Sequence, residues 1–411
     1  MGPVRTPPET TTGWGRLQAV AISGSAAEGL MLAALPLLAV SVTTDPREVS
    51  LINVVGQSPW LLFSLFAGVL IDRLKRTTVL AWAYGVQVGA ALALAVAGSA
   101  GWLSLPVLLM VAFAVTSAQV LGEGASGALV PELVPPDRLT AANARLAVID
   151  GGVQFVVPPL TGFLIAVAAG APAWLAGVVA LTALLLARGI PSAAIVRERK
   201  HPLHDIADGL KQLVRMPLLR SITFNVALGS FAASAGTAMF VLYTTQVLHV
   251  GPVGYGVLLA CGAVGWVGSS FFVQKVVARL GYSWSMRMAQ AGAALAHLLI
   301  AIVPPWPPLI GAVLIFLSSV VLVWNVCSQS SRQRFTPPEV LGRVLTSHRA
   351  LAWGLNPLGA LTGGLVAAHW NLRGVWIVAG VIMTVSAVYV WFSLSPAAFR
   401  KAEADGVRPR S

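Results

Sequence analysis

The sequence has 411 residues, of which 56% are hydrophobic and only 10% are charged, and its formal net charge is +12. Soluble domains carry about 25% charged residues, so this composition excludes an ordinary soluble protein and indicates a protein embedded in a membrane. A basic chain can also bind nucleic acid, but the position of the basic residues along the chain argues against that class, as described below.

Apolar stretches long enough to cross a hydrocarbon core of about 30 Å as helices follow one another from Leu17 to Leu394. Because only Gly, Ser and Pro separate some neighbouring stretches, as at 97–102, counts of eleven and thirteen spans stay open. We predict twelve spans, at residues 16–42, 48–71, 77–98, 103–130, 143–168, 173–190, 219–248, 253–275, 284–303, 308–331, 344–368 and 372–394.

The basic residues are distributed unevenly over the predicted loops. Of 27 Lys and Arg residues, only Arg47 and Arg373 fall in loops on one side, and Arg349 falls inside a span. The others lie on the opposite side, which the positive-inside rule makes cytoplasmic. We therefore predict a multi-pass membrane protein with both termini in the cytoplasm, and no nucleic-acid partner, since topology and anionic lipid account for the positive charge. The Ala-rich composition, with more Arg than Lys, indicates a bacterium, so the predicted location is a bacterial cytoplasmic membrane.

Glu28 lies near the middle of the first span. On insertion scales an acidic side chain at this depth costs about 2.5–3.5 kcal/mol, so it should face a cavity or a partner. A low-dielectric environment disfavours the charged form of an acid, which lets the group gain and lose a proton as water reaches it or leaves. We predict Glu28 as the coupling acid of a transport cycle. The alternative is a protonated Glu28 that is hydrogen-bonded to a neighbouring helix.

Two further acids lie in predicted spans. Glu123, in the inner part of the fourth span, is predicted to share a proton or a cationic substrate with Glu28, or alternatively to be solvated near the cytoplasm. Asp150 follows Arg145 by five residues, a spacing that does not place two residues on one helix face. Asp150 therefore has a partner elsewhere, either in the cavity or in a structural ion pair.

Two stretches far apart in the sequence resemble each other. "PPDRLTAANAR" (135–145) and "PPEVLGRVLTS" (337–347) are offset by 202 residues, and Gly162 and Gly364 keep that offset. Each stretch lies between the fourth and fifth spans of its half, which indicates a parallel duplication of a six-helix unit, a symmetry that transporters use around a central site. The predicted organisation is an N-terminal bundle (1–190), a cytoplasmic linker with an amphipathic helix (191–218), a C-terminal bundle (219–394) and a cytoplasmic tail (395–411).

The stretch "GVLIDRLKRTTVL" between the second and third spans is similar to motif A of the major facilitator superfamily. "LVPELVPPDRLTAANA", "ADGLKQLVRMPLLR" and "PPEVLGRV" resemble loops of a narrower branch, the bacterial drug and siderophore exporters related to the enterobactin exporter. The resemblance implies an all-α integral membrane fold of twelve transmembrane helices in two pseudo-twofold-related six-helix bundles. The residues that it assigns to a cytoplasmic gate are Gly68, Asp72, Arg73 and Arg76. We predict that Arg343 and Arg349 belong to the same gate, with Arg349 as a latch to the motif A region of the other half.

"VVPPLTGF" in the fifth span resembles the antiporter motif C of this family through Pro158, Pro159 and Gly162. It departs from that motif because Pro158 and Phe163 stand where the motif has Gly. The Arg of the family's motif B is absent from the fourth span, which offers Gln119 and Glu123 instead. In the second half, the candidates for an aromatic and polar cavity wall are Phe231, Phe240, Tyr243, Trp324 and Asn325. The alternative for each of them is packing in the core.

Together these features predict a secondary active transporter that exports amphipathic small molecules, such as drugs or natural products, against proton entry by rocking alternating access. A dedicated transporter of a siderophore or another metabolite is the alternative within transport, and a transport-inactive membrane scaffold or sensor is the alternative of another class. The sequence has no phosphate-binding loop, metal-ligand cluster or nucleophile elbow, so we expect neither enzymatic activity nor a cofactor or metal. The expected partners are the small-molecule substrate, protons and the lipid bilayer, and we expect a monomer.

Overall fold

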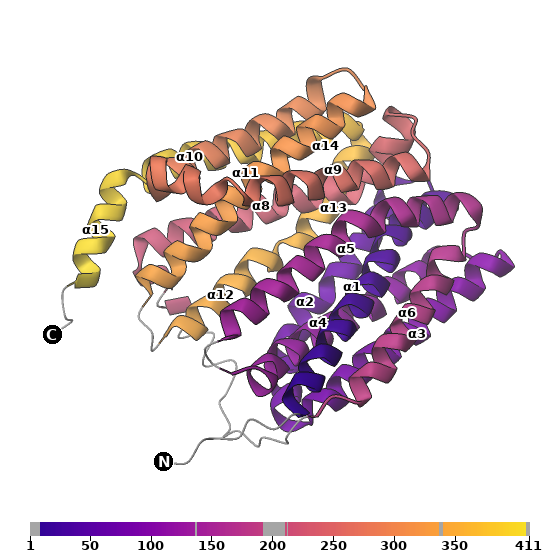
Figure 1. Cartoon of the computed structure of the whole chain (residues 1–411). Coiled ribbons are helices and arrows are strands. Elements are labelled where there is room, and N and C mark those ends of the chain that lie inside the picture. The colour runs from indigo at the N-terminus through magenta and orange to yellow at the C-terminus, as the bar shows by residue number, and fades with distance from the viewer. Residues whose placement is uncertain (1–8, 136–137, 192–209, 212, 337–339, 408–411) are drawn as a thin grey trace, which may run out of the picture. The chain divides into compact units, whose positions relative to one another are not determined.

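The computed structural model describes residues 9–135, 138–191, 210–211, 213–336 and 340–407. Over these residues the fold is helical, without a β-strand (Figure 1). The helices are α1 (Glu9–Val42), α2 (Pro46–Arg73), α3 (Arg76–Ala100), α4 (Leu105–Leu133), α5 (Leu139–Val167), α6 (Ala171–Arg188), α8 (Pro217–Leu242), the π-helix η2 (Tyr243–Val247), α9 (Pro252–Ser270), α10 (Val273–Ile302), α11 (Pro307–Phe335), α12 (Leu341–Gly354), α13 (Asn356–His369), α14 (Leu372–Ser393) and α15 (Pro396–Val407).

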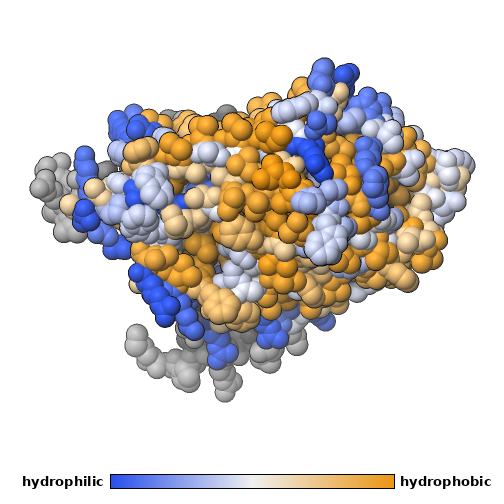
Figure 2. Space-filling view, turned by 90° about the horizontal axis from the view of Figure 1, so that it is seen from above, coloured by the Kyte–Doolittle hydropathy of each residue, from blue (hydrophilic) through white to orange (hydrophobic). Residues whose placement is uncertain are grey.

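Eleven segments of the described chain are long and apolar enough to cross a membrane, and they coincide with eleven of the twelve predicted spans. The remaining predicted span, 48–71, lies within α2. Helices are favoured here because each one satisfies its own backbone hydrogen bonds where no water is available. Hydrophobic side chains also cover much of the surface seen in Figure 2, and large apolar residues such as Met110 (65% exposed) contribute to the exposed surface.

The helix ends repeat with the period that the two similar stretches show in the sequence. α4 and α11 begin 202 residues apart and also end 202 residues apart. The same offset separates the starts of α5 and α12, the ends of α5 and α13, and the ends of α3 and α10. The two halves therefore share one pattern of helix lengths and turns, as expected for a duplicated six-helix unit.

The chain forms two compact units that differ from a simple division into halves. Unit 1 comprises Met1–Thr43, Val55–Arg199 and Gly251–Val257, and unit 2 comprises Thr44–Val54, Lys200–Val250 and Leu258–Ser411. The start of α2 is thus grouped with the second half, and the start of α9 with the first. The division at residues 190 and 219 that we predicted does not include this exchange.

Close backbone contacts hold the two exchanged segments. In unit 1, Gly162 of α5 lies so near the carbonyl oxygen of Pro252 that no Cβ would fit. In unit 2, Gly364 of α13 lies similarly close to Ser50 of α2. Gly162 and Gly364 are 202 residues apart, and so are Ser50 and Pro252, so the same contact occurs once in each unit.

Three features of the fold differ from the predicted elements. The predicted eleventh span is broken between α12 and α13 at Leu355, because Pro357 lacks an N–H group and its ring clashes with the carbonyl of the preceding turn. α10 contains a non-helical residue, Gly281, whose φ of 73° suits glycine. The predicted tail after residue 395 contains the helix α15, whose Phe399 is buried among residues of α8, α10 and α11.

The predicted linker falls largely outside the described residues. The sequence predicts its amphipathic helix because Ile206, Leu210, Leu213 and Val214 recur at helical spacing. Ile206 lies among residues that the structure does not describe. Leu213 is buried against Leu219 and Val344 of unit 2, whereas Leu210 and Val214 are exposed. The described end of the segment thus has one buried face.

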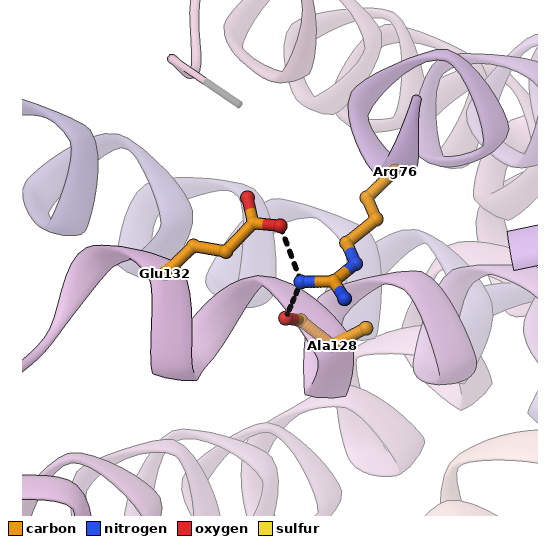
Figure 3. A network of polar contacts seen from close by, with 3 residues as sticks. All are labelled: Arg76, Ala128 and Glu132. Carbon is orange, nitrogen blue, oxygen red and sulfur yellow. Dashed lines mark hydrogen bonds and ion pairs between the residues drawn. The ribbon is translucent and has the colours of Figure 1, made fainter. Parts of the chain in front are cut away.

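A buried ion pair joins α3 to α4 in unit 1 (Figure 3). One terminal nitrogen of Arg76, the first residue of α3, donates to the carboxylate of Glu132 and to the carbonyl oxygen of Ala128 (2.6 Å). The two charged side chains are only 11% and 12% exposed. Arg76 therefore satisfies a carbonyl near the end of α4 and is neutralised by a carboxylate on the same turn.

Replacing Glu132 with Gln should destabilise the protein strongly, because removing one partner of a buried pair costs about 3–5 kcal/mol. The matched control is Arg334→Gln, since Arg334 pairs with Glu403 at 3.1 Å with both side chains about half exposed. An exposed pair contributes about 0–1 kcal/mol. Thermal unfolding of both variants in one detergent measures the difference in stability. Equal decreases in unfolding temperature would contradict the conclusion that the Arg76–Glu132 pair contributes more than an exposed pair.

Candidate functional site

Glu28 lies at the middle of the candidate span Gly13–Val42 on α1. At a rise of 1.5 Å per residue, its backbone is about 20 Å from either end of that span, too far for the side chain to reach an end. Glu28 is partly buried, and its neighbours Ala27 and Leu30 are each 2% exposed. Polar partners for its carboxyl group must therefore come from the adjacent helices.

Tyr84 of α3 is one such group, and sequence reasoning missed it. Its side chain is 7% exposed. Its hydroxyl and ring edge lie against Gly24, one helical turn before Glu28 on α1, where an added Cβ would collide with them. Gly24 thus lets the phenol approach the backbone of α1 next to the turn that carries Glu28.

Asp150 of α5 also points to this part of α1. Its Oδ1 atom accepts a hydrogen bond of 2.7 Å from the hydroxyl of Ser25, three residues before Glu28. Arg145 lies instead near Gln18, whose amide oxygen, in the orientation that satisfies both neighbours, accepts from the Nε atom of Arg145 (3.2 Å) and the indole N–H of Trp14 (2.8 Å). The expectation that Asp150 does not pair with Arg145 agrees with these contacts.

Glu123 brings α4 into the same group. Its Oε1 atom accepts from the amide of Gln119 one turn earlier, at 3.0 Å, and its side chain is exposed. The adjacent Gly122 packs against Ala83, the residue before Tyr84. The backbone of α4 at Glu123 therefore lies beside the turn of α3 that carries Tyr84.

Four helices of unit 1 thus contribute one group each to what we call the carboxyl cluster: Glu28, Tyr84, Glu123 and Asp150. The carboxyl groups of Glu123 and Asp150 interact electrostatically with that of Glu28, and all three interact with the Tyr84 hydroxyl. Such a cluster can hold a proton or attract a cation.

The second half does not repeat the cluster. The positions offset by 202 residues from Glu28, Glu123 and Asp150 are Ser230, Asn325 and Ala352. The duplication kept the helices at these positions but not the acids. The negative charge of the carboxyl cluster therefore has no counterpart at these positions in unit 2.

A model of the Major Facilitator Superfamily matches residues 19–355, which is most of the chain. The chain belongs to this superfamily. An uncharacterized transporter of the superfamily from Sinorhizobium fredii (strain NBRC 101917 / NGR234) is 24% identical over 368 residues, which cover 80% of this chain and 82% of that protein. Among curated proteins, a second uncharacterized member, from Bacillus subtilis (strain 168), is 23% identical over 64% of this chain and 66% of its own length.

Solved structures of other membrane transporters share the fold at low sequence identity. A bacterial homologue of the iron transporter ferroportin, in an inward-facing state, superposes with a TM-score of 0.75 at 15% identity over 93% of this chain and 98% of its own. A D-xylose-proton symporter gives 0.70 at 13% identity over 93% of this chain and 96% of its own. These likenesses confirm the predicted all-helical fold. The match to the superfamily model identifies the protein as a membrane transporter.

The residues of motif A are described only in part. Gly68, Asp72 and Arg73 fall in the section of α2 whose side chains lie outside the description, and the side chain of Arg343 does so in α12. Arg76 binds Glu132 within unit 1. The gate that we assign to these residues stays a prediction.

The fifth-span motif has a defined packing role. α5 continues as a helix through Pro158 and Pro159. Gly256 of α9 lies against the carbonyl oxygen of Pro158 and the Cα of Pro159, and Gly162 lies against Pro252. The motif therefore forms a backbone-to-backbone contact with the part of α9 that belongs to unit 1.

The aromatic candidates of the second half lie mostly in packed positions of unit 2. Phe240 and Tyr243 are 5% and 0% exposed. Their rings pack edge-to-face on Trp376, with ring centres 6.3 and 6.1 Å apart. Trp324 is 7% exposed and belongs to a buried apolar cluster. Phe231 is partly buried and Asn325 is exposed, so these two have more open positions than the other three.

Gly24→Ala should destabilise unit 1, because the new methyl group would displace the Tyr84 ring from α1, and such overpacking costs about 1–3 kcal/mol. Tyr84→Leu removes the colliding ring edge, so Gly24→Ala should cost less in that background, with a coupling of about 0.5–3 kcal/mol.

Thermal unfolding of the four forms of this double-mutant cycle measures the coupling. Gly89→Ala on α3, where a Cβ would meet nothing within 4 Å, is the control for adding a methyl group to a glycine. Additive effects of Gly24→Ala and Tyr84→Leu would contradict the contact.

Proposed function

We propose that the protein is a proton-coupled exporter of amphipathic small molecules, of the drug and natural-product type, in a bacterial cytoplasmic membrane. It works by rocking alternating access, as a monomer with both termini in the cytoplasm. The observation that supports this proposal is the carboxyl cluster of unit 1, which gathers three acids and a phenol on four membrane helices.

The cluster has the properties that proton coupling requires. Glu28 lies far from both ends of its span, at a depth where an uncompensated charge is costly. Ser25 and Gln119 donate hydrogen bonds to Asp150 and Glu123. Glu28 is therefore proposed as the acid that takes up and releases the proton, while the other two acids provide the negative field.

The direction of transport and the substrate are inferred from the same cluster and from the loops that resemble the bacterial drug and siderophore exporters. An amphipathic cation would bind to the carboxyl groups from the cytoplasm and be released outside the cell. A proton entering from outside would then take its place at the carboxyl groups. A dedicated siderophore or metabolite transporter is the second candidate, because those resembling loops are shared with a siderophore exporter. A transport-inactive scaffold or sensor would carry the cluster without moving a substrate.

Glu28→Gln should abolish pH-driven export, because a side-chain amide is neither protonated nor deprotonated at neutral pH. The assay follows efflux of ethidium from cells that lack other efflux pumps, with and without an uncoupler, at matched protein levels. Glu48→Gln is the matched control, since Glu48 lies in the first turn of α2 and outside the cluster.

Wild-type efflux that the uncoupler does not affect would reject proton coupling, and undiminished efflux by Glu28→Gln would remove Glu28 from the mechanism. Protection against one compound only would favour a dedicated transporter. No movement of any compound would favour the scaffold or sensor.

A further inference from the structure

A buried arginine and two tryptophans form what we call the arginine–tryptophan cluster of unit 2. Arg287 lies on α10, six residues after the non-helical Gly281, and is 8% exposed. The central carbon of its guanidinium group is 5.2 Å from the ring centre of Trp284 and 5.1 Å from that of Trp391 on α14. The two indole rings are 5.6 Å apart and stand at 87° to each other. The guanidinium group therefore lies in a corner that two aromatic rings form.

This cluster lies where a membrane span ends. Trp391 is two residues before the end of α14 at Ser393, about 3 Å along the helix axis. One turn before Arg287, Ser283 donates to the carbonyl of Leu394, the residue after α14 (2.5 Å). Trp284 and Trp391 are 43% and 39% exposed, and tryptophan is enriched at the boundary between membrane and water. The guanidinium group thus lies close to the depth of the lipid headgroups.

The helices of the C-terminal bundle offer Arg287 no carboxylate. The sequences of α8, α10, α11 and α14 contain neither Asp nor Glu. The nearest acids in the sequence lie outside these helices. Glu339 comes between α11 and α12, Glu403 pairs with Arg334, and Asp405 is nine residues into α15, about 14 Å from its start. Over the described residues, Arg287 has no ion pair.

The contacts that the guanidinium group makes are with neutral groups. One terminal nitrogen of Arg287 donates to the carbonyl oxygen of Trp391, and the buried Nε atom has no acceptor. The faces of aromatic rings attract a cation, but the rings, like the carbonyl, carry no net charge. Arg287 therefore keeps a positive charge that an anion from outside the protein can neutralise.

Unit 1 does not repeat this cluster. The positions offset by 202 residues from its three members are occupied by Trp82, Gly85 and Gly189. The carbonyl oxygen of Gly189 accepts from a terminal nitrogen of Arg16 on α1, and Arg16 is exposed. An exposed arginine is therefore enough to satisfy this carbonyl. The buried arginine and the second ring of unit 2 go beyond that requirement.

We propose that Arg287, Trp284 and Trp391 form a binding site for the phosphate group of an anionic lipid. A guanidinium group matches phosphate oxygens with several donors in one plane, and the indole N–H groups of the two tryptophans are further donors. Arg400 and Lys401 at the start of α15 are exposed, and basic residues at a membrane surface attract anionic lipid. The bound lipid neutralises Arg287 and stabilises the contact between α10 and α14. The site does not depend on the carboxyl cluster of unit 1.

Thermal unfolding of the purified full chain in nanodiscs tests this proposal, with phosphatidylglycerol replacing phosphatidylcholine stepwise. The unfolding temperature of wild type should rise with the content of phosphatidylglycerol, because a ligand of the folded state stabilises it. Arg287→Gln should weaken phosphatidylglycerol binding by about tenfold or more, as expected for loss of a charged hydrogen bond. Each variant is compared between the two lipids, so a change in its basal stability does not affect the result.

Arg279→Gln is the matched control, because Arg279 is an exposed residue of the same helix and its loss changes the net charge equally. This variant should keep the stabilisation by phosphatidylglycerol. Arg287→Lys retains the charge but lacks the planar set of donors, so its affinity for phosphatidylglycerol should fall. It decides the question if Arg287→Gln does not fold, and an unchanged affinity would contradict the assigned site.

Two further outcomes would overturn the proposal. One is wild type that phosphatidylglycerol does not stabilise, and the other is an equal loss in Arg279→Gln and Arg287→Gln, which would show a general effect of net charge. Inorganic phosphate, titrated against chloride at constant ionic strength in detergent, tests the other source of the phosphate group. Stabilisation as strong as that by phosphatidylglycerol would assign the site to a free phosphate compound and reject the lipid. None of these readouts depends on transport, so failure of the proposed export function would leave the test intact.

Discussion

The rest of the structure depends on one constraint, which is that a charge placed inside a membrane span needs a compensating group from another helix. Arg76 is compensated by Glu132 across α3 and α4. The guanidinium group of Arg287 on α10 lies over the indole rings of Trp284 and Trp391, with its central carbon 5.2 and 5.1 Å from their centres, and it donates to the carbonyl of Trp391 on α14. In both cases the compensating group fixes two helices against each other.

The two halves meet this constraint with different chemistry at their centres. Unit 1 places three acids and Tyr84 together, whereas unit 2 has a buried neutral network in which Ser386 donates to Asn225 and Asn225 donates to Gln290 at 3.2 Å. A neutral amide network keeps its hydrogen bonds at every pH and holds α8, α10 and α14 together. Acids change charge with water access, so the proposed coupling belongs to unit 1. A common ancestor accounts for the helices that the two halves share, but the three acids occur at these positions in unit 1 only.

The membrane spans and the duplication could be predicted from the sequence, because apolar length and the 202-residue offset are one-dimensional properties. Glu28 and Asp150 could be singled out because an acid within an apolar run is unusual. Their neighbours could not be predicted. Tyr84 reaches α1 only because Gly24 leaves room for it, and Ser25 faces Asp150 across two helices. Helical periodicity gives the faces of one helix but not the rotation of its neighbours. α15 was missed because its sequence is too polar to register as a span.

The fifth-span motif shows how a degenerate motif can keep a physical role. The motif C pattern has Gly where this chain has Pro158, yet the helix continues and Gly256 of α9 still approaches the carbonyl of Pro158. Helix packing in lipid relies on small residues that let two backbones come close, since the solvent supplies no hydrophobic drive between helices. Here the small residue is supplied by α9, so Pro158 can replace Gly on α5 without opening the contact. Gly162 has no such substitute, because the carbonyl oxygen of Pro252 occupies the space that its Cβ would need.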